Sequence, residues 1–252
     1  MKLSIIVISY NESKYLGAAL ESCLKQEGGH ELEIIIGDDG SSDGSIDIIR
    51  EYQEKYPEII RYFVMERNNP QNVIPSLRVS NVIKRGFFLA TGDYLMVMSG
   101  DDLLVADNKC RMQIDFLEKH PGYSACYTNY MKFWDSGEKD VLKNYPLGFN
   151  ALFWSRYYAH ITCFVFRRSV LENLTKTFCD DTGLIFSILK TGKIAYLPVV
   201  AFGYRQRPVS IMSSSNEMEL NLLELLLLQD LLESKGYFFS SLSRCSKPLA
   251  FV

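Results

Sequence analysis

Four short apolar runs alternate with helix-like segments between residues 3 and 99, and this alternation constrains the fold most strongly. The runs cover 3–9, 32–36, 60–65 and 94–99. Each is bounded by turn residues, as strands buried on both faces of a sheet are. Between them, apolar residues recur at helical spacing, as at Leu16, Leu20 and Leu24. This alternation favours an α/β fold with a parallel, doubly wound sheet and helices on both faces.

The second half of the chain is less regular. No repeat or low-complexity linker divides it, so we expect one domain over residues 1–212. The expected elements are helices over 108–119 and 181–190 and strands over 123–133, 161–167 and 194–204.

The C-terminal tail over 213–252 is read as helical. Ser214 and Glu217 form a capping box before the run MELNLLELLLLQDLLES. This run is too short and too interrupted to span a bilayer, which takes about 20 residues. Packing on the domain, pairing in a homodimer and contact with a membrane surface all remain open. Packing is favoured, because the run lacks the Lys and Arg that an anionic surface attracts.

Composition narrows the class of protein. A net charge of -3 argues against broad nucleic-acid binding, which requires a basic surface. The opening MKLSIIVISYNE reads as a first strand and not as a secretion signal, because its apolar run is short. The 6 cysteines lack CxxC spacing, which argues against zinc or a disulfide framework and suits buried thiols in a reducing compartment.

Acidic residues follow the apolar runs where strands should end. Glu12 follows the first run, Asp38 and Asp39 the second, and Asp101 and Asp102 the fourth. The carboxyl ends of parallel strands share one edge, where ligands bind, so these carboxylates should converge. Their mutual repulsion requires a cation or hydrogen-bond donors. Oxygen ligands without clustered His or Cys favour Mg²⁺ or Mn²⁺, which commonly joins carboxylates to substrate phosphates.

Each acidic stretch also has a purely structural explanation. DDGSSD is a good start for a helix, and SGDD suits a turn before one. Neither GxxxxGK[ST] nor GxGxxG occurs, so a P-loop or a dinucleotide fingerprint does not explain the acids. Their joint appearance after buried strands favours a nucleoside diphosphate held through a metal.

The ordered set of motifs resembles family 2 glycosyltransferases. The motifs are SYNE at 9–12, DDGSSD at 38–43, ATGDY at 90–94, SGDD at 99–102 and YRQRPVSI at 204–211. The resemblance covers roughly residues 3–212 and implies the GT-A fold, with a Rossmann-like, mostly parallel central sheet flanked by helices. It implies a nucleotide-sugar-binding half over 1–105 and an acceptor-binding half over 106–212.

The resemblance also implies roles for individual residues. The residues at the end of the first strand would lie against the nucleotide, Asp39 would hydrogen-bond its base with Asp38 beside it, and two arginines would contact the phosphates. The expected nucleotide-sugar site is Ser9, Tyr10, Asn11, Glu12, Asp38, Asp39, Asp101, Arg205 and Arg207.

The metal and the catalytic base are placed in the same way. Asp101 and Asp102 would hold the metal on the diphosphate. The family often has an acid where this chain has Ser99, which leaves two carboxylates rather than three. Asp181, with Asp180 beside it, opens a short helix where the family commonly places its base.

We therefore expect a metal-dependent, inverting glycosyltransferase. The donor is expected to be a UDP-sugar, and the acceptor a glycan or lipid-linked saccharide of cell-surface polysaccharide biosynthesis. The expected location is the cytoplasm, including the inner face of a membrane. A sugar-phosphate nucleotidyltransferase and a degenerate nucleotide-sugar-binding protein without turnover are the alternatives.

A lone histidine and an aromatic segment lie outside these motifs. His160 is expected to be structural, as a lone histidine usually is. Aromatic faces stack on sugar rings, so the aromatic residues of 149–158 are expected to contact the acceptor. They are Phe149, Phe153, Trp154, Tyr157 and Tyr158.

Overall fold

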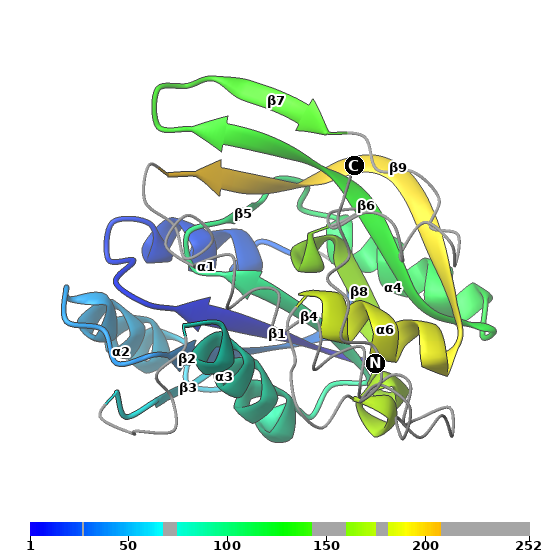
Figure 1. The fold of residues 1–252 in the computed structure, drawn as a ribbon, viewed down its shortest axis with the longest axis horizontal. Coiled ribbons are helices and arrows are strands. Elements are labelled where there is room, and N and C mark those ends of the chain that lie inside the picture. Colours follow the sequence, from blue (N-terminus) through cyan, green and yellow to red (C-terminus); the bar gives the residue numbers. More distant parts are fainter. Residues whose placement is uncertain (27, 68–74, 143–159, 175–180, 208–252) are drawn as a thin grey trace, which may run out of the picture.

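A computed structural model describes residues 1–26, 28–67, 75–142, 160–174 and 181–207 (Figure 1). The C-terminal tail, Asp180 and the aromatic residues of 149–158 therefore lie outside the described residues.

The first half of the chain builds the parallel part of the sheet, as the alternation predicts. Its elements are β1 (Lys2–Ser9), α1 (Leu16–Leu24), β2 (Glu31–Asp38), α2 (Ser45–Lys55), β3 (Ile60–Val64), α3 (Pro75–Leu89) and β4 (Tyr94–Ser99). β1 pairs in parallel with β2 and with β4, and β2 pairs in parallel with β3. All four strands consequently end at the same edge.

The second half extends the sheet with mixed pairing. Its elements are β5 (Leu103–Leu104), α4 (Lys109–Lys119), β6 (Tyr123–Trp134), β7 (Lys139–Leu142), η1 (Ile161–Cys163), β8 (Phe164–Arg167), η2 (Arg168–Asn173), α6 (Asp181–Thr191) and β9 (Lys193–Gln206). The strand expected over 161–167 is shorter than predicted, because its first three residues form the 3₁₀ turn η1. β8 runs antiparallel to both β4 and β6.

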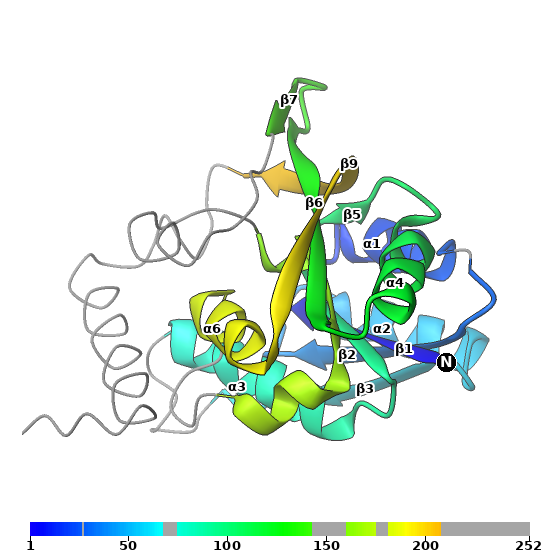
Figure 2. The same cartoon turned by 90° about the vertical axis from the view of Figure 1, so that its right-hand side faces the viewer.

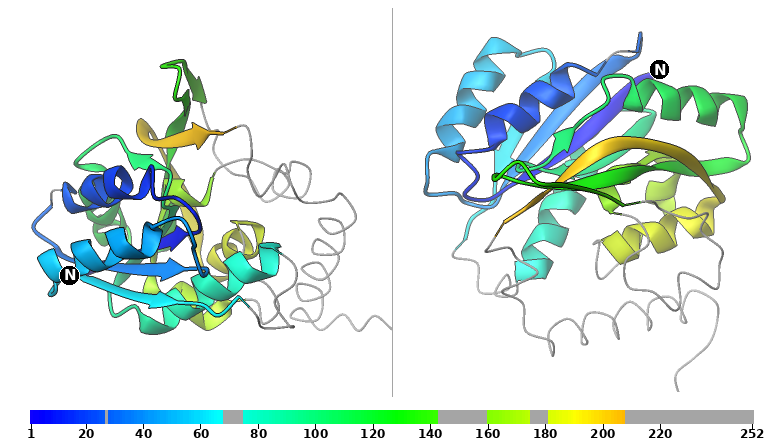
Figure 3. Two further views of the ribbon diagram at one scale, coloured as in Figure 1. Left: turned by 90° about the vertical axis from the view of Figure 1, so that its left-hand side faces the viewer. Right: turned by 90° about the horizontal axis from the view of Figure 1, so that it is seen from above.

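Within the described residues the strands form one nine-stranded sheet in the order β3-β2-β1-β4-β8-β6-β9-β5, with β7 paired to β6. β6 and β9 are long and lie side by side in parallel register, with shifts near Thr128 and Asn129 (Figure 3). The arrow of β1 points to the side of the molecule where β9 also ends (Figure 1). The two halves of the chain therefore meet at the edge where the acidic motifs lie.

The side chains of β1 alternate between two cores. Leu3, Ile5 and Val7 lie in a cluster with buried residues of α1, α2 and α4, whereas Ile6 lies in a cluster with residues of α3 and α6. Figure 2 shows these two groups of helices on opposite faces of the sheet. Because both faces are covered, β1 reads as a continuous apolar run in the sequence.

One further expectation, that of buried thiols, is met by the described residues. Cys23, Cys110, Cys126 and Cys163 are buried free thiols. Among the helices that the structure describes, none combines the length and the apolar character needed to cross a bilayer.

Candidate active site

Hydrogen bonds fasten the loop after β1 to the loop after β2. The Asn11 N–H donates to Ser41 Oγ (2.8 Å), and the Ser42 N–H donates to Asn11 Oδ1 (2.9 Å). Asn11 has a φ of 52°, a left-handed conformation that Asn tolerates better than most residues. The Glu12 N–H donates to Ser45 Oγ (2.9 Å). The SYNE and DDGSSD motifs thus form one rim at the carboxyl ends of the strands.

The two acids after β2 have different partners. Asp38 is fully buried, and its carboxylate accepts the Ser41 N–H and the Ser41 hydroxyl, both at 2.7 Å. The Asp39 carboxylate is paired with Arg78 of α3, whose Nη2 and Nε lie 2.6 and 2.8 Å from Oδ2. Sequence reasoning did not predict Arg78, because helical arginines are usually solvated. Its position between apolar positions of α3 was the available signal.

The acids after β4 lie beside Glu12. A Cβ atom added to Gly100 would lie 2.5 Å from Glu12 Oε2, so this buried carboxylate abuts the SGDD turn. Arg207 bridges the two: its Nη2 lies 2.7 Å from Asp101 Oδ2 and 3.3 Å from Glu12 Oε1. The structure therefore brings together the ends of β1 and β4 and the arginine that follows β9.

Unpartnered oxygens mark this edge. Among the described residues, Ser9 Oγ, Glu12 Oε2 and Asp102 Oδ2 are buried without a hydrogen-bond partner. The other oxygen of Asp102 accepts the Arg205 N–H at 2.9 Å. Burial, followed by the charge of Asp101, raises the pKa of the Glu12 and Asp102 carboxyls well above their usual values. Because a buried oxygen without a donor is costly, this edge is suited to receive a cation.

These oxygens fit a hard divalent cation that arrives with its substrate. Mg²⁺ is usually bound through one or two carboxylates, and water and phosphates complete its shell. Within the part of the chain that the structure describes, no three His, Cys, Asp or Glu side chains are grouped to hold a metal. Asp101 and Asp102, with the unpartnered Oδ2 of Asp102, match a Mg²⁺ site to which the protein contributes only one or two carboxylates.

The remaining predicted residues lie on separate elements. Tyr10 follows β1, and the Arg67 guanidinium lies 3.8 Å from the centre of its ring. Arg205 lies near the end of β9, with its N–H on Asp102. Asp181 is the first residue of α6, at the helix start where it was predicted.

His160 has the surroundings of a structural residue. Its ring lies 4.9 Å from the ring of Phe202 and 4.7 Å from that of Tyr204, between centroids. Its Nδ1 accepts the Thr162 N–H at 3.3 Å. Burial lowers the pKa of His160 to about 4, so the ring is neutral near pH 7.

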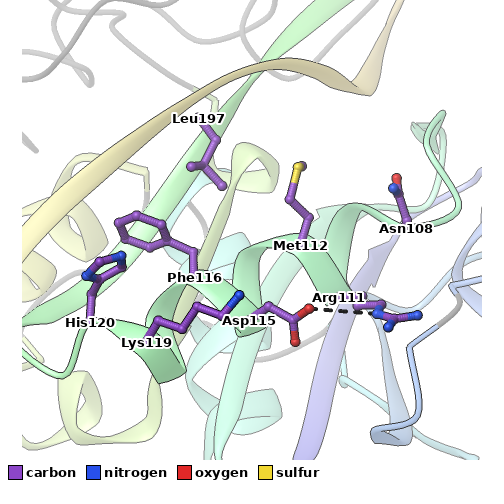
Figure 4. A pocket seen from close by; sticks show the side chains of 8 residues that line it. All are labelled: Asn108, Arg111, Met112, Asp115, Phe116, Lys119, His120 and Leu197. Carbon is purple, nitrogen blue, oxygen red and sulfur yellow. Dashed lines mark ion pairs between the residues drawn. The ribbon is translucent and has the colours of Figure 1, made fainter.

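A separate hollow of about 400 Å³ lies along the outer face of α4 (Figure 4). Leu197 of β9 faces the helix across it, and the Arg111–Asp115 ion pair (3.7 Å) lies at one side. None of the predicted site residues is among its lining, which is Asn108, Arg111, Met112, Asp115, Phe116, Lys119, His120 and Leu197.

The sheet order and the acidic edge define an α/β protein of the GT-A type, with its ligand site at the carboxyl ends of parallel strands. The sequence model of Glycosyl transferase family 2 matches residues 4–175. The chain therefore belongs to this family, which confirms the resemblance seen in the motifs.

Sequence relatives agree with the family. The chain is 31% identical over 138 residues to the uncharacterized protein Rv1520 of Mycobacterium tuberculosis, covering 55% of this chain and 38% of the relative. It is 31% identical over 136 residues to the putative glycosyltransferase EpsE of Bacillus subtilis, covering 54% of this chain and 45% of the relative. The chain thus matches less than half the length of these curated relatives.

Solved structures agree with the fold. S. aureus TarS 1-349, in complex with UDP-GlcNAc, superposes with a TM-score of 0.68 at 20% identity, covering 92% of this chain and 67% of that one. The mannosyltransferase PcManGT from Pyrobaculum calidifontis, in complex with GDP-Man and Mn²⁺, gives a TM-score of 0.57 at 17% identity, covering 93% and 63%. The predicted GT-A architecture is thereby confirmed.

Proposed function

We propose that this chain catalyses metal-dependent, inverting transfer of a sugar from a nucleoside diphosphate to a hydroxyl of a glycan or lipid-linked saccharide. The carrying observation is the buried, unpartnered oxygen of Asp102 beside Asp101 and Glu12 at the carboxyl edge of a family 2 chain. A diphosphate with its cation would satisfy that oxygen. The ligands named for the two structural neighbours, UDP-GlcNAc and GDP-Man with Mn²⁺, belong to this chemical class.

The nucleoside would lie on the rim formed by the loops after β1 and β2. Ser9 and Tyr10 would contact it from one loop, and Asp38 and Asp39 from the other. Arg78 holds Asp39 in one orientation, so this carboxylate would meet the base without first having to be ordered. A UDP-sugar is the proposed donor.

The diphosphate would lie over the acids after β4. Asp101 and Asp102 would hold Mg²⁺ or Mn²⁺, which when bound stabilises negative charge on the leaving diphosphate. Arg207 would bind phosphate oxygens with its charge and donors. Glu12 would fix the orientation of the Arg207 guanidinium, because Glu12 Oε1 already lies 3.3 Å from Arg207 Nη2.

The acceptor hydroxyl is a weak nucleophile near neutral pH, so a base must take its proton as it attacks. We assign that role to Asp181 at the start of α6, with Asp180 next to it. Inversion requires the base to act from the face of the sugar opposite the leaving group. We further propose that the reaction serves cell-surface polysaccharide synthesis in the cytoplasm, at the inner face of the membrane.

The test is incubation of the purified chain with a panel of UDP-sugars and GDP-mannose, with Mn²⁺, with Mg²⁺ or with EDTA. Release of nucleoside diphosphate that EDTA abolishes supports the proposal. Release of pyrophosphate would identify a nucleotidyltransferase instead. Donor binding without turnover under every metal and acceptor condition would identify a non-catalytic binding protein.

The base assignment has its own test. Asp181→Asn should keep donor affinity and lose transfer, since removing a general base typically costs about 10²–10⁴-fold in rate. Glu172→Gln, at an exposed acid of the neighbouring η2, is the matched control and should transfer at the wild-type rate. Wild-type transfer by Asp181→Asn would refute the assignment.

A further inference from the structure

Asp135, in the turn after β6, gathers three donors from distant parts of the chain. Its Oδ2 lies 2.6 Å from Lys14 Nζ and accepts the Tyr15 hydroxyl at 3.0 Å. Its Oδ1 lies 2.6 Å from Arg205 Nη1. The turn between β6 and β7 is thereby fastened both to the start of α1 and to the end of β9.

Arg205 connects this turn to the acids of the site. Its side-chain Nε donates to the Asp101 carbonyl oxygen (2.8 Å), and its backbone N–H donates to Asp102 Oδ1 (2.9 Å). Its guanidinium lies over two rings, 4.3 Å from the centre of the Tyr15 ring and 4.5 Å from that of the Phe133 ring. The side chain is 11% exposed. The Arg205 side chain is therefore more enclosed by protein than that of Arg207, which is 25% exposed.

We propose that Asp135 is a positioning residue of the donor site: it holds Arg205, and through Arg205 it sets the orientation of Asp101 and Asp102. The inference rests on the proposed function, because it assigns these acids to donor binding. It gives Arg205 an indirect role, in which the arginine orders the carboxylates while Arg207 meets the phosphates. Asp102 Oδ2 stays unpartnered because Arg205 occupies only Oδ1.

The exposure of Asp135 distinguishes a positioning role in the donor site from a contribution to the stability of the fold. The Asp135 side chain is 44% exposed and that of Lys14 is 70% exposed. Ion pairs at such exposed positions add little to global stability. Loss of Asp135 should therefore leave the melting temperature nearly unchanged and appear in the binding of the donor.

The test compares Asp135→Ala with Glu138→Ala, which removes an exposed carboxylate from the same turn. Calorimetry measures the affinity for UDP in the presence of Mn²⁺, and a melting curve measures folding. We expect Asp135→Ala to weaken UDP binding by about tenfold or more, as removal of a residue behind a metal ligand typically does. Glu138→Ala should bind UDP as the wild type does.

A double-mutant cycle tests the route through Arg205. In an Arg205→Met background, Asp135→Ala should cause little further loss, because its effect depends on the arginine. Full additivity would overturn the inference, as would unchanged UDP affinity in Asp135→Ala or an equal loss in Glu138→Ala. A wild-type chain that binds no nucleotide would overturn the proposed function and this inference together, whereas the other outcomes refute the inference alone.

Discussion

Replacing Asp102 by Asn should stabilise the ligand-free protein while removing its response to metal and nucleotide. The Asp102 carboxylate is fully buried, and one of its oxygens has no donor. An unsatisfied buried polar group costs about 1–3 kcal/mol, and more when it is charged. The amide keeps the oxygen that accepts the backbone N–H of Arg205, and it cannot carry the negative charge that burial and Asp101 disfavour.

The expected gain in unfolding free energy is therefore about 1–3 kcal/mol. In a chain of this size, each kcal/mol raises the melting temperature by about 2–4 °C. Thermal unfolding without ligand should show Asp102→Asn melting above the wild type. Addition of Mn²⁺ and UDP should raise the melting temperature of the wild type and leave that of the variant unchanged.

Asp107→Asn provides the control, because Asp107 is an exposed acid a few residues further along the chain. It should match the wild type in both conditions. A ligand-free Asp102→Asn protein that melts below the wild type would refute the view that the buried carboxylate oxygen without a donor destabilises the protein. A full response to Mn²⁺ and UDP would refute its assignment to the metal.

Two other perturbations test the surroundings of the site. Arg78→Met should lower the unfolding free energy by up to about 3–5 kcal/mol, because it leaves the Asp39 carboxylate, which is 13% exposed, without its partner. Urea unfolding should show most of this loss recovered in the Asp39→Asn/Arg78→Met double variant. The pKa of His160 falls from 6.5 to about 4 on folding, so between these values the unfolded chain binds a proton that the folded chain does not. The contribution of neutral His160 to the unfolding free energy is thus complete above pH 6.5 and is lost as the pH falls toward 4. Urea unfolding of His160→Gln should therefore show a smaller decline in unfolding free energy over this range than the wild type. An equal decline would exclude His160 as the cause.

The parallel half of the fold could be predicted because its strands are buried on both faces. A run such as residues 3–9 can satisfy its side chains only inside a two-faced core, and successive parallel strands must end at one edge. The placement of the acids at 12, 38–39 and 101–102 along one edge of the sheet follows from that geometry.

The partners of these acids could not be predicted in the same way. Arg78 and Asp135 come from distant segments, and only tertiary packing selects them. The antiparallel insertion of β8 was equally hidden, because the four residues Phe164–Arg167 carry no signal for strand direction. Helical periodicity placed Asp181 at a helix start, whereas its role in the site rests on the family resemblance.

The pairing of β5 with β9 limits how this protein can be rebuilt. Leu103 and Leu104, directly after the acids, lie opposite Gly203 and Phe202, so the SGDD turn is anchored to a strand that arrives about a hundred residues later. Grafting residues 1–105 onto a foreign C-terminal segment would leave Asp102 without the backbone N–H of Arg205 and β5 without its neighbouring strand. A chimera that keeps the SGDD turn in place would have to carry β9 along with residues 1–105.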